Sequence, residues 1–458
     1  MTRAPAPAHP ADPAGPRGSA ARMGLDSRPA WAWAMYDWAN SAFATTILAA
    51  VLPIYVREVA GAGLPAGNAE AYWGYANAIG LLIVAVLSPV LGAMADHLGA
   101  KKRFLAGFVA VGVVATAALA QSGRGDWLMA LAWFVVGFVG FAGANVFYDA
   151  LLPHVARADR GDVLSAAGFA MGYLGGGILL ALNLWWITDY ERFGLPDAAA
   201  ASRLAIGSVA VWWALFTLPL MRFVSEPARR AVPADATGGS PVRASFARLA
   251  AAARALPRYR QLALFLGAFW LYSDGIGTIV KMATIYGSGI GIGRNDLIGA
   301  LLLTQFAGVP FALAYGRLAV RIGARRAVQL GLGVYVGICA FGYAMTEPWQ
   351  FWVLALMVAT VQGGVQALSR SLFASMVPRA QSAAFFGFFS VSAKLAGVLG
   401  PVMFGVVTQT TGNSRLAILF IAVFFIAGAG LLAKLDVAEG QRVARAEDAA
   451  SLALEAAA

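Results

Sequence analysis

Six ionisable residues lie inside long apolar segments of this sequence, where charge is unfavourable. They are three acids and three bases: Asp37, Asp149, Asp274, Lys281, Arg370 and Lys394. A charge at the centre of a bilayer costs about 2.5–3.5 kcal/mol even on lenient insertion scales, so such residues usually face a pathway, a partner or water. Equal numbers of acids and bases predict near-neutral pairing across a cavity. Ion pairs that only position helices would leave the same pattern.

Polar residues recur on one helical face of two of these segments. Residues three or four apart share a face of an α-helix. One face therefore carries Trp270, Asp274, Gly277 and Lys281, and another carries Gln362, Gln366 and Arg370. Lipid satisfies no hydrogen bond, so both faces are predicted to meet protein or water. Asp274 and Lys281 are about 10 Å apart along a helix, so each needs a partner elsewhere.

A further group is predicted to close one end of the cavity. Arg370 lies about 12 Å before the end of its apolar segment, and Asp149 lies about 6 Å before the end of its own. At this similar depth an unpaired arginine is costly. Asp149 or Asp37 is the expected partner, and Asn40 and Asn145 can add hydrogen bonds. The pair is expected to separate when water enters from this end.

The most distinctive motif is GAMADHLGAKKR at residues 92–103. The residues of interest are Gly92, Asp96, Gly99, Lys101, Lys102 and Arg103. Gly92 permits a close helix contact and Gly99 a tight turn. Asp96, at a helix end, can accept backbone N–H groups or pair with a base.

Part of this motif recurs 224 residues later, which predicts an internal repeat. The recurring residues are Gly316, Gly323, Arg325 and Arg326. Val320 stands where Asp96 aligns, so a contact made by that acid is not expected in the second half. Pro153 and Gly175 also recur, 225 residues later, as Pro378 and Gly400.

The elements that carry these residues are predicted to be membrane-spanning helices. Hydrophobic residues make up 60% of the 458 and charged residues 12%, half the charged share of a soluble domain. Continuous rather than alternating apolar runs exclude a membrane β-barrel. Twelve runs reach spanning length, near residues 33–56, 72–95, 104–121, 127–150, 163–186, 203–224, 261–286, 297–320, 327–345, 350–376, 385–409 and 415–434.

The distribution of Lys and Arg predicts the orientation. Of the 34, the tails and alternate loops carry 24, the other loops carry six, and four lie within helices. The positive-inside rule then places both termini in the cytoplasm. The expected location is the cell (inner) membrane. This distribution also argues against nucleic-acid binding despite the net charge of +11.

The longest connection divides the chain into two halves. The predicted units are a disordered cytoplasmic tail (1–30), a six-helix bundle (31–224), a cytoplasmic connecting loop (225–260), a second six-helix bundle (261–435) and a cytoplasmic tail (436–458). The connecting loop is either an interfacial helix or a disordered basic linker. Gly168, Gly172 and Gly176 are predicted to form a helix-packing face.

Several of these segments resemble a known family. They are WAMYDWANSAFATT (33–46), NVFYDALLP (145–153), GYLGG (172–176), LYSDG (271–275), QGGVQALSRS (362–371) and FGFFSVSAK (386–394). Together they resemble the vacuole-effluxer-like family of the major facilitator superfamily (MFS), whose fungal relatives are linked to amino-acid export from vacuoles. Residues 92–103 resemble the superfamily's signature loop, which implies a role in the conformational switch rather than in substrate binding. The resemblance also implies that the first, fourth, seventh and tenth helices line the cavity.

These features favour a secondary transporter that moves a small solute by alternating access. The mixed charges suit an amino acid, and protons carried by Asp37, Asp149 or Asp274 could couple transport. A sugar, drug or other metabolite carrier and a non-transporting sensor remain alternatives. One cysteine, Cys339, and three scattered histidines give no metal-ligand spacing, and no catalytic triad, nucleotide loop or cofactor motif is present.

Overall fold

The computed structural model describes residues 23–65, 68–157, 160–227, 259–289, 294–395, 397, 399–411 and 414–457 of an all-α protein. The first half contains α2 (Arg28–Ala42), η1 (Phe43–Ala50), α3 (Val51–Tyr55), η2 (Val56–Ala60), α4 (Asn68–Leu98), α5 (Lys101–Leu119), α6 (Trp127–Val155), α7 (Gly161–Thr188), η3 (Tyr190–Phe193) and α8 (Ala198–Phe223).

The second half contains α10 (Arg260–Gly289), α11 (Arg294–Ile322), α12 (Ala324–Ala344), α13 (Trp349–Ser375), η5 (Arg379–Gln381), α14 (Ser382–Leu395), α15 (Leu399–Thr411), α16 (Ser414–Ala433) and α17 (Val437–Ala457). Eleven helices of the described chain are long and apolar enough to cross a membrane. The twelfth predicted segment, 385–409, is also helical but is divided into α14 and α15. Most of the predicted tail and connecting loop, residues 1–22 and 228–258, lies outside the described residues, and α2 begins within the predicted tail, at Arg28.

The first spanning helix runs from α2 to η2 and changes its winding on the way. Ser27 caps its start by accepting a hydrogen bond from Ala30 N at 3.2 Å. At η1 the helix widens to π geometry, a distortion that often marks functional sites. Thr45 in this stretch donates to the carbonyl of Gly176 on α7 at 3.2 Å. The widened turn therefore joins the helix to α7.

Close packing of α2 on α7 depends on the predicted glycine face. A Cβ atom at Gly172 would lie 2.5 Å from Ser41 Oγ, and one at Gly176 would lie 3.0 Å from the carbonyl of Ser41. Small residues let helix backbones approach without a clash. The packing prediction for this face is confirmed.

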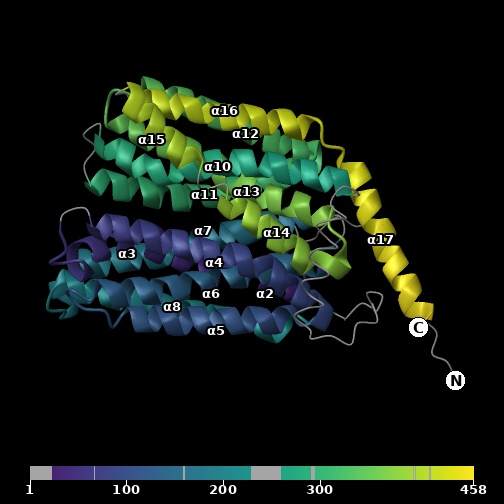
Figure 1. Ribbon diagram of the computed structural model, residues 1–458, viewed down its shortest axis with the longest axis horizontal. Coiled ribbons are helices and arrows are strands. Elements are labelled where there is room, and N and C mark those ends of the chain that lie inside the picture. Colours follow the sequence, from purple (N-terminus) through teal and green to yellow (C-terminus); the bar gives the residue numbers. More distant parts are fainter. Residues whose placement is uncertain are drawn as a thin grey trace.

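Figure 1 shows the helices of the two halves as two bundles that lie side by side. Contacts between the bundles run from α7 to α11 and α13, and from α4 to α14. The helix α17 lies across one end of the molecule, which we call the α17 end. The halves meet there along two lines of contact, the α4–α14 seam and the α7–α13 seam.

Candidate functional site

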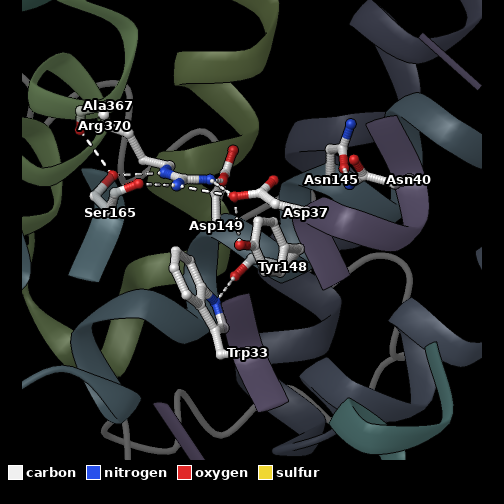
Figure 2. A network of polar contacts seen from close by, with 9 residues as sticks. All are labelled: Trp33, Asp37, Asn40, Asn145, Tyr148, Asp149, Ser165, Ala367 and Arg370. Carbon is white, nitrogen blue, oxygen red and sulfur yellow. Dashed lines mark hydrogen bonds and ion pairs between the residues drawn. The ribbon is translucent and has the colours of Figure 1, made fainter. Parts of the chain in front are cut away.

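Arg370 of α13 is the centre of a polar network that joins the two halves (Figure 2). Its Nη2 lies 3.1 Å from Asp37 Oδ2 on α2, and its Nη1 lies 3.3 Å from Asp149 Oδ1 on α6. Its Nε donates to Ser165 Oγ on α7 at 2.9 Å, and its Nη2 also donates to the Ser165 carbonyl at 3.0 Å. The expected pairing of Arg370 with an acid of the first half is therefore present with both acids.

Aromatic rings surround the guanidinium. The centroids of Phe169, Trp33 and Tyr148 lie 4.6, 4.8 and 5.4 Å from Arg370 Cζ. Such rings attract a cation through their negative faces, and the attraction is stronger where water is excluded. The Tyr148 hydroxyl donates to Asp37 Oδ2 at 2.8 Å. The rings thus stabilise the charge and fix its acidic partner.

The network fits because α7 leaves room for it. A Cβ atom at Gly168 would lie 2.5 Å from Asp37 Oδ2 and 3.0 Å from Arg370 Nη2. One turn earlier, Ser165 donates from Oγ to the Ala367 carbonyl of α13 at 2.8 Å. The glycine and serine of α7 therefore provide both the space and the acceptors that Arg370 needs.

A cavity of 520 Å³ adjoins this network and is lined by both halves. Asp37, Asp149 and Arg370 line it, and on its wall Asn40 donates to Asn145 Oδ1 at 2.7 Å. The remaining lining residues are amides, small, aliphatic or hydroxyl side chains and rings: Ser41, Ala44, Phe141, Tyr148, Phe169, Phe269, Tyr272, Ser273, Ile276, Gly277, Val280, Gln362, Gln366, Ser369 and Phe389. The cavity is largely apolar, with a charged group in its wall.

The structure brings together most of the predicted site residues, but α10 is rotated relative to the expectation. Its lining residues include Tyr272, Ser273 and Gly277, whereas Trp270 and Asp274 are absent from the lining. Asp274 is 1% exposed, and its backbone lies next to Gly400 of α15. Apolar packing of α10 thus turns its aromatic and small residues to the cavity. The side chains of Lys281 and Lys394 lie outside the part that the structure describes.

The 92–103 loop forms the α4–α14 seam. Asp96 accepts hydrogen bonds from Ala383 N at 3.2 Å and Ala384 N at 2.8 Å, in the first turn of α14, and pairs with Lys101 Nζ at 2.9 Å. Free N–H groups and the helix dipole favour an anion at this position. A Cβ atom at Gly92 would lie 2.3 Å from the Ala383 carbonyl oxygen, so only glycine permits this approach.

Other residues of this loop bind the surrounding chain. Lys101 Nζ also donates to the Arg379 carbonyl at 3.4 Å, in η5 of the second half. Lys102 contacts Val224 and Glu226, beyond α8. Gly99 has a φ of 59°, the left-handed turn expected for this glycine. Arg103 lies in the first turn of α5 and is exposed.

The repeated loop packs differently in the second half. A Cβ atom at Gly316 would lie 2.7 Å from Ala166 Cβ on α7, so the close helix contact recurs. Val320 is 66% exposed, so the position aligned with Asp96 is not buried in the second half. Next to Arg370, Ser371 instead donates to Asp162 in the first turn of α7. The α7–α13 seam therefore contains an acid from α7, Asp162, whereas the acid of the α4–α14 seam is Asp96 at the end of α4.

Four residues around Arg370 were not predicted as site residues: Trp33, Tyr148, Ser165 and Phe169. Two of them directly adjoin residues with a sequence signal, because Tyr148 precedes Asp149 and Phe169 follows Gly168. Ser165 precedes the glycine face of α7 by three residues, which could have identified it. Trp33 opens the segment 33–46 that resembles the family and lies one turn before Asp37, but neither observation identified it as a neighbour of Arg370. No group of three or more His, Cys, Asp or Glu residues that could hold a metal occurs in the described chain.

The sequence of this chain matches a known family over residues 65–445, the one described as "Vacuole effluxer Atg22 like". The MFS-type transporter YxiO of Bacillus subtilis is 40% identical over 403 residues, which cover 88% of this chain and 93% of that protein. Autophagy-related protein 22 of Yarrowia lipolytica is 28% identical over 318 residues, covering 63% of this chain and 52% of the relative.

Solved structures show the same fold at low sequence identity. The human organic anion transporter MFSD10 (TETRAN) superposes with a TM-score of 0.64 at 17% identity, covering 88% of this chain and 99% of that chain. The proton:xylose symporter XylE superposes with a TM-score of 0.66 at 13% identity, covering 90% and 95%. These similarities establish the major facilitator fold.

Proposed function

Because the chain belongs to the Atg22-like vacuole effluxer family and is a membrane transporter of the major facilitator superfamily, we propose that it moves a small solute by alternating access through the 520 Å³ cavity. One observation carries the proposal. The cavity lies between the halves, and its wall contains Arg370 of one half bound to two acids of the other. Moving the halves apart at this end would open the cavity and separate the charges.

The Arg370 network is proposed to act as the gate at the α17 end. Several contacts beside it also join the halves, including Ser165 to Ala367 and Ser371 to Asp162. Opening requires water to replace these partners, since an arginine without them is costly at this depth. The 92–103 loop is proposed to work with it as the conformational switch, because Asp96 binds the start of α14.

An amino acid is proposed as the solute. A zwitterion can meet an acid and a base, and Asp149 and Arg370 lie together in the cavity wall. Gln362 and Gln366 add amide donors and acceptors on α13, and the rings suit an apolar side chain. The name of the matched family, which refers to vacuole effluxers, agrees with a solute exporter.

Protons are proposed as the coupling ion, carried by a carboxylate of the gate. Asp149 is the more accessible of the two acids, with its side chain 20% exposed against 12% for Asp37. A cell-membrane location is proposed, and the charge distribution supports an orientation with both tails and the α17 end in the cytoplasm.

Reconstitution into liposomes tests transport directly. Liposomes that contain the protein and are loaded with a mixture of amino acids, sugars and other metabolites should lose one class of solute faster than equally loaded liposomes without protein. An imposed proton gradient should change that rate. Failure of every solute to move, in either direction, would contradict transport. Movement of sugars alone would contradict the amino-acid assignment.

A reversible cross-link tests the gate separately. Asp162→Cys and Ser371→Cys, placed together in a Cys339→Ala background, should form a disulfide across the α7–α13 seam because these side chains touch. Oxidation should then stop transport, and a reductant should restore it. Each single-cysteine variant controls for the substitutions. Undiminished transport by the oxidised double variant would overturn the gate.

A further inference from the structure

The two halves begin their third helix in a similar way. Gly99 and Gly323 both have positive φ, and α12 starts directly after Gly323, whereas Ala100 separates Gly99 from the start of α5. The second residue of each helix is basic and reaches a carbonyl just beyond the last spanning helix of its half. Lys102 Nζ donates to Val224 O at 2.7 Å, and Arg325 Nη1 donates to Leu435 O at 2.6 Å.

In the first half a carboxylate completes this arrangement. The backbone N–H of Lys102 donates to Glu226, whose Oε1 and Oε2 lie 3.0 and 3.1 Å away. The first N–H groups of a helix have no partner within the helix, and the dipole makes this end positive. Glu226 therefore supplies an oxyanion to the N-terminus of α5.

In the second half the chain supplies no such group among the described residues. Glu226 follows the accepting carbonyl residue by two positions, and the residue two positions after Leu435 is the apolar Val437. No described side chain caps α12. A cavity of 740 Å³ lies here instead, between the start of α12 and the linker from α16 to α17, which crosses this end in Figure 1.

The charges around this cavity favour an anion. Arg325, Arg326 and Lys434 line it, and within the described chain none of the three forms an ion pair. The two acids in its wall already have donors. Asp162 accepts from Ser371, and Asp436 accepts from Glu439 N at 3.0 Å. Three cations thus surround a helix N-terminus whose counterpart in the first half binds a carboxylate.

We propose that this cavity binds an oxyanion, the phosphate group of either an anionic lipid or free phosphate. The planar guanidinium and the N–H groups of a first helical turn both suit a phosphate oxygen. Bound there, the anion joins α12 to the linker before α17, as Glu226 joins α5 to the segment after α8. This cavity is distinct from the one that holds Arg370, although the Asp162–Ser371 contact of the α7–α13 seam lies in its wall. Binding there can be measured without measuring transport.

Binding to the purified full chain tests the site. Inorganic phosphate, titrated against chloride at constant ionic strength, is one probe, and mixed micelles of phosphatidylglycerol or of phosphatidylcholine are the other. Wild-type protein should gain thermal stability with phosphate, with phosphatidylglycerol, or with both. Removing two charged partners in Arg326→Gln/Lys434→Gln should weaken the binding by about tenfold or more.

Arg321→Gln is the control. Arg321 is exposed and lies next to Ile322, which lines the cavity at the end of α11, but Arg321 itself does not line it. This variant should bind as the wild type does. A response to phosphatidylglycerol alone assigns the site to a lipid headgroup, and a response to inorganic phosphate assigns it to a free anion. Equal responses to phosphate and chloride together with equal responses to the two lipids would overturn the proposal. Wild-type affinity in the double variant would also overturn it.

Discussion

The two seams at the α17 end join the same pair of bundles with different chemistry. In the α4–α14 seam, Asp96 binds backbone N–H groups at the start of a helix and pairs with Lys101. In the α7–α13 seam, Arg370 lies among aromatic rings with Asp37 and Asp149. One side of the contact between the bundles is therefore held by an acid at a helix start and the other by a buried arginine.

The difference predicts unequal resistance to opening. Asp96 and Lys101 belong to the same half, so they remain paired when the seam opens, and what breaks is the hydrogen bonds from Asp96 to α14 and from Lys101 to the Arg379 carbonyl. Opening the α7–α13 seam separates Arg370 from both of its acids. A buried charge that loses its partner is far more costly than a lost hydrogen bond. The α7–α13 seam should therefore set most of the barrier.

The largest effect is expected from Arg370→Gln, which removes the shared cation of the α7–α13 seam. It leaves two carboxylates without that partner, a cost of about 3–5 kcal/mol by analogy with broken buried ion pairs. Thermal unfolding in detergent should show a large fall in midpoint, with transport lost. Arg321→Gln, the same change at an exposed position, should leave both unchanged. An unaltered unfolding midpoint for Arg370→Gln would contradict the prediction that the α7–α13 seam sets most of the barrier to opening.

The two acids of the same seam should differ. Asp37 Oδ2 accepts from Tyr148 and from both Arg370 Nη atoms, and its side chain is less exposed than that of Asp149. Asp37→Asn should therefore destabilise by about 2–3 kcal/mol and Asp149→Asn by about 1–2 kcal/mol. Unfolding of both variants, alone and combined with Arg370→Gln, measures each coupling. The reverse order would mean that Asp149 is the main partner.

A smaller effect is expected from Asp96→Asn in the α4–α14 seam. The amide still accepts hydrogen bonds, but its interaction with Lys101 and with the α14 dipole is lost, about 1 kcal/mol. Labelling of Ala384→Cys by a maleimide should become about fivefold faster, since this position is 6% exposed when the seam is closed. Labelling at the rate of the parent cysteine variant would show that the acid does not hold the seam.

The smallest effect is expected from Val320→Asp, which restores the acid of the first loop to the second. Val320 is 66% exposed, whereas the Asp96 side chain is 6% exposed. The new carboxylate should not reach α7, and the change in stability should stay within about 0.5 kcal/mol. A clear gain in stability would mean that the loops are more alike than their contacts indicate.

The sequence alone determined the helices and the probable partners of the buried charges. Apolar length fixed the spanning segments, because a bilayer demands about 20 apolar residues. The depth of Arg370 was enough to predict a contact with Asp149 or Asp37, since buried charges require partners. The glycine spacing of α7 predicted close packing, because small residues on one face let two helix backbones approach.

Only the tertiary structure decided which face of each helix meets the cavity. Helix α10 turns Tyr272 and Ser273 toward it rather than Asp274, because packing against several neighbours sets the rotation and spacing within one helix does not. The rings around Arg370 come from α2, α6 and α7, so no local pattern could assemble them. The exposure of Val320 also depends on where the neighbouring helices lie. Periodicity shows which residues of a helix share a face, and the arrangement of the other helices determines what that face contacts.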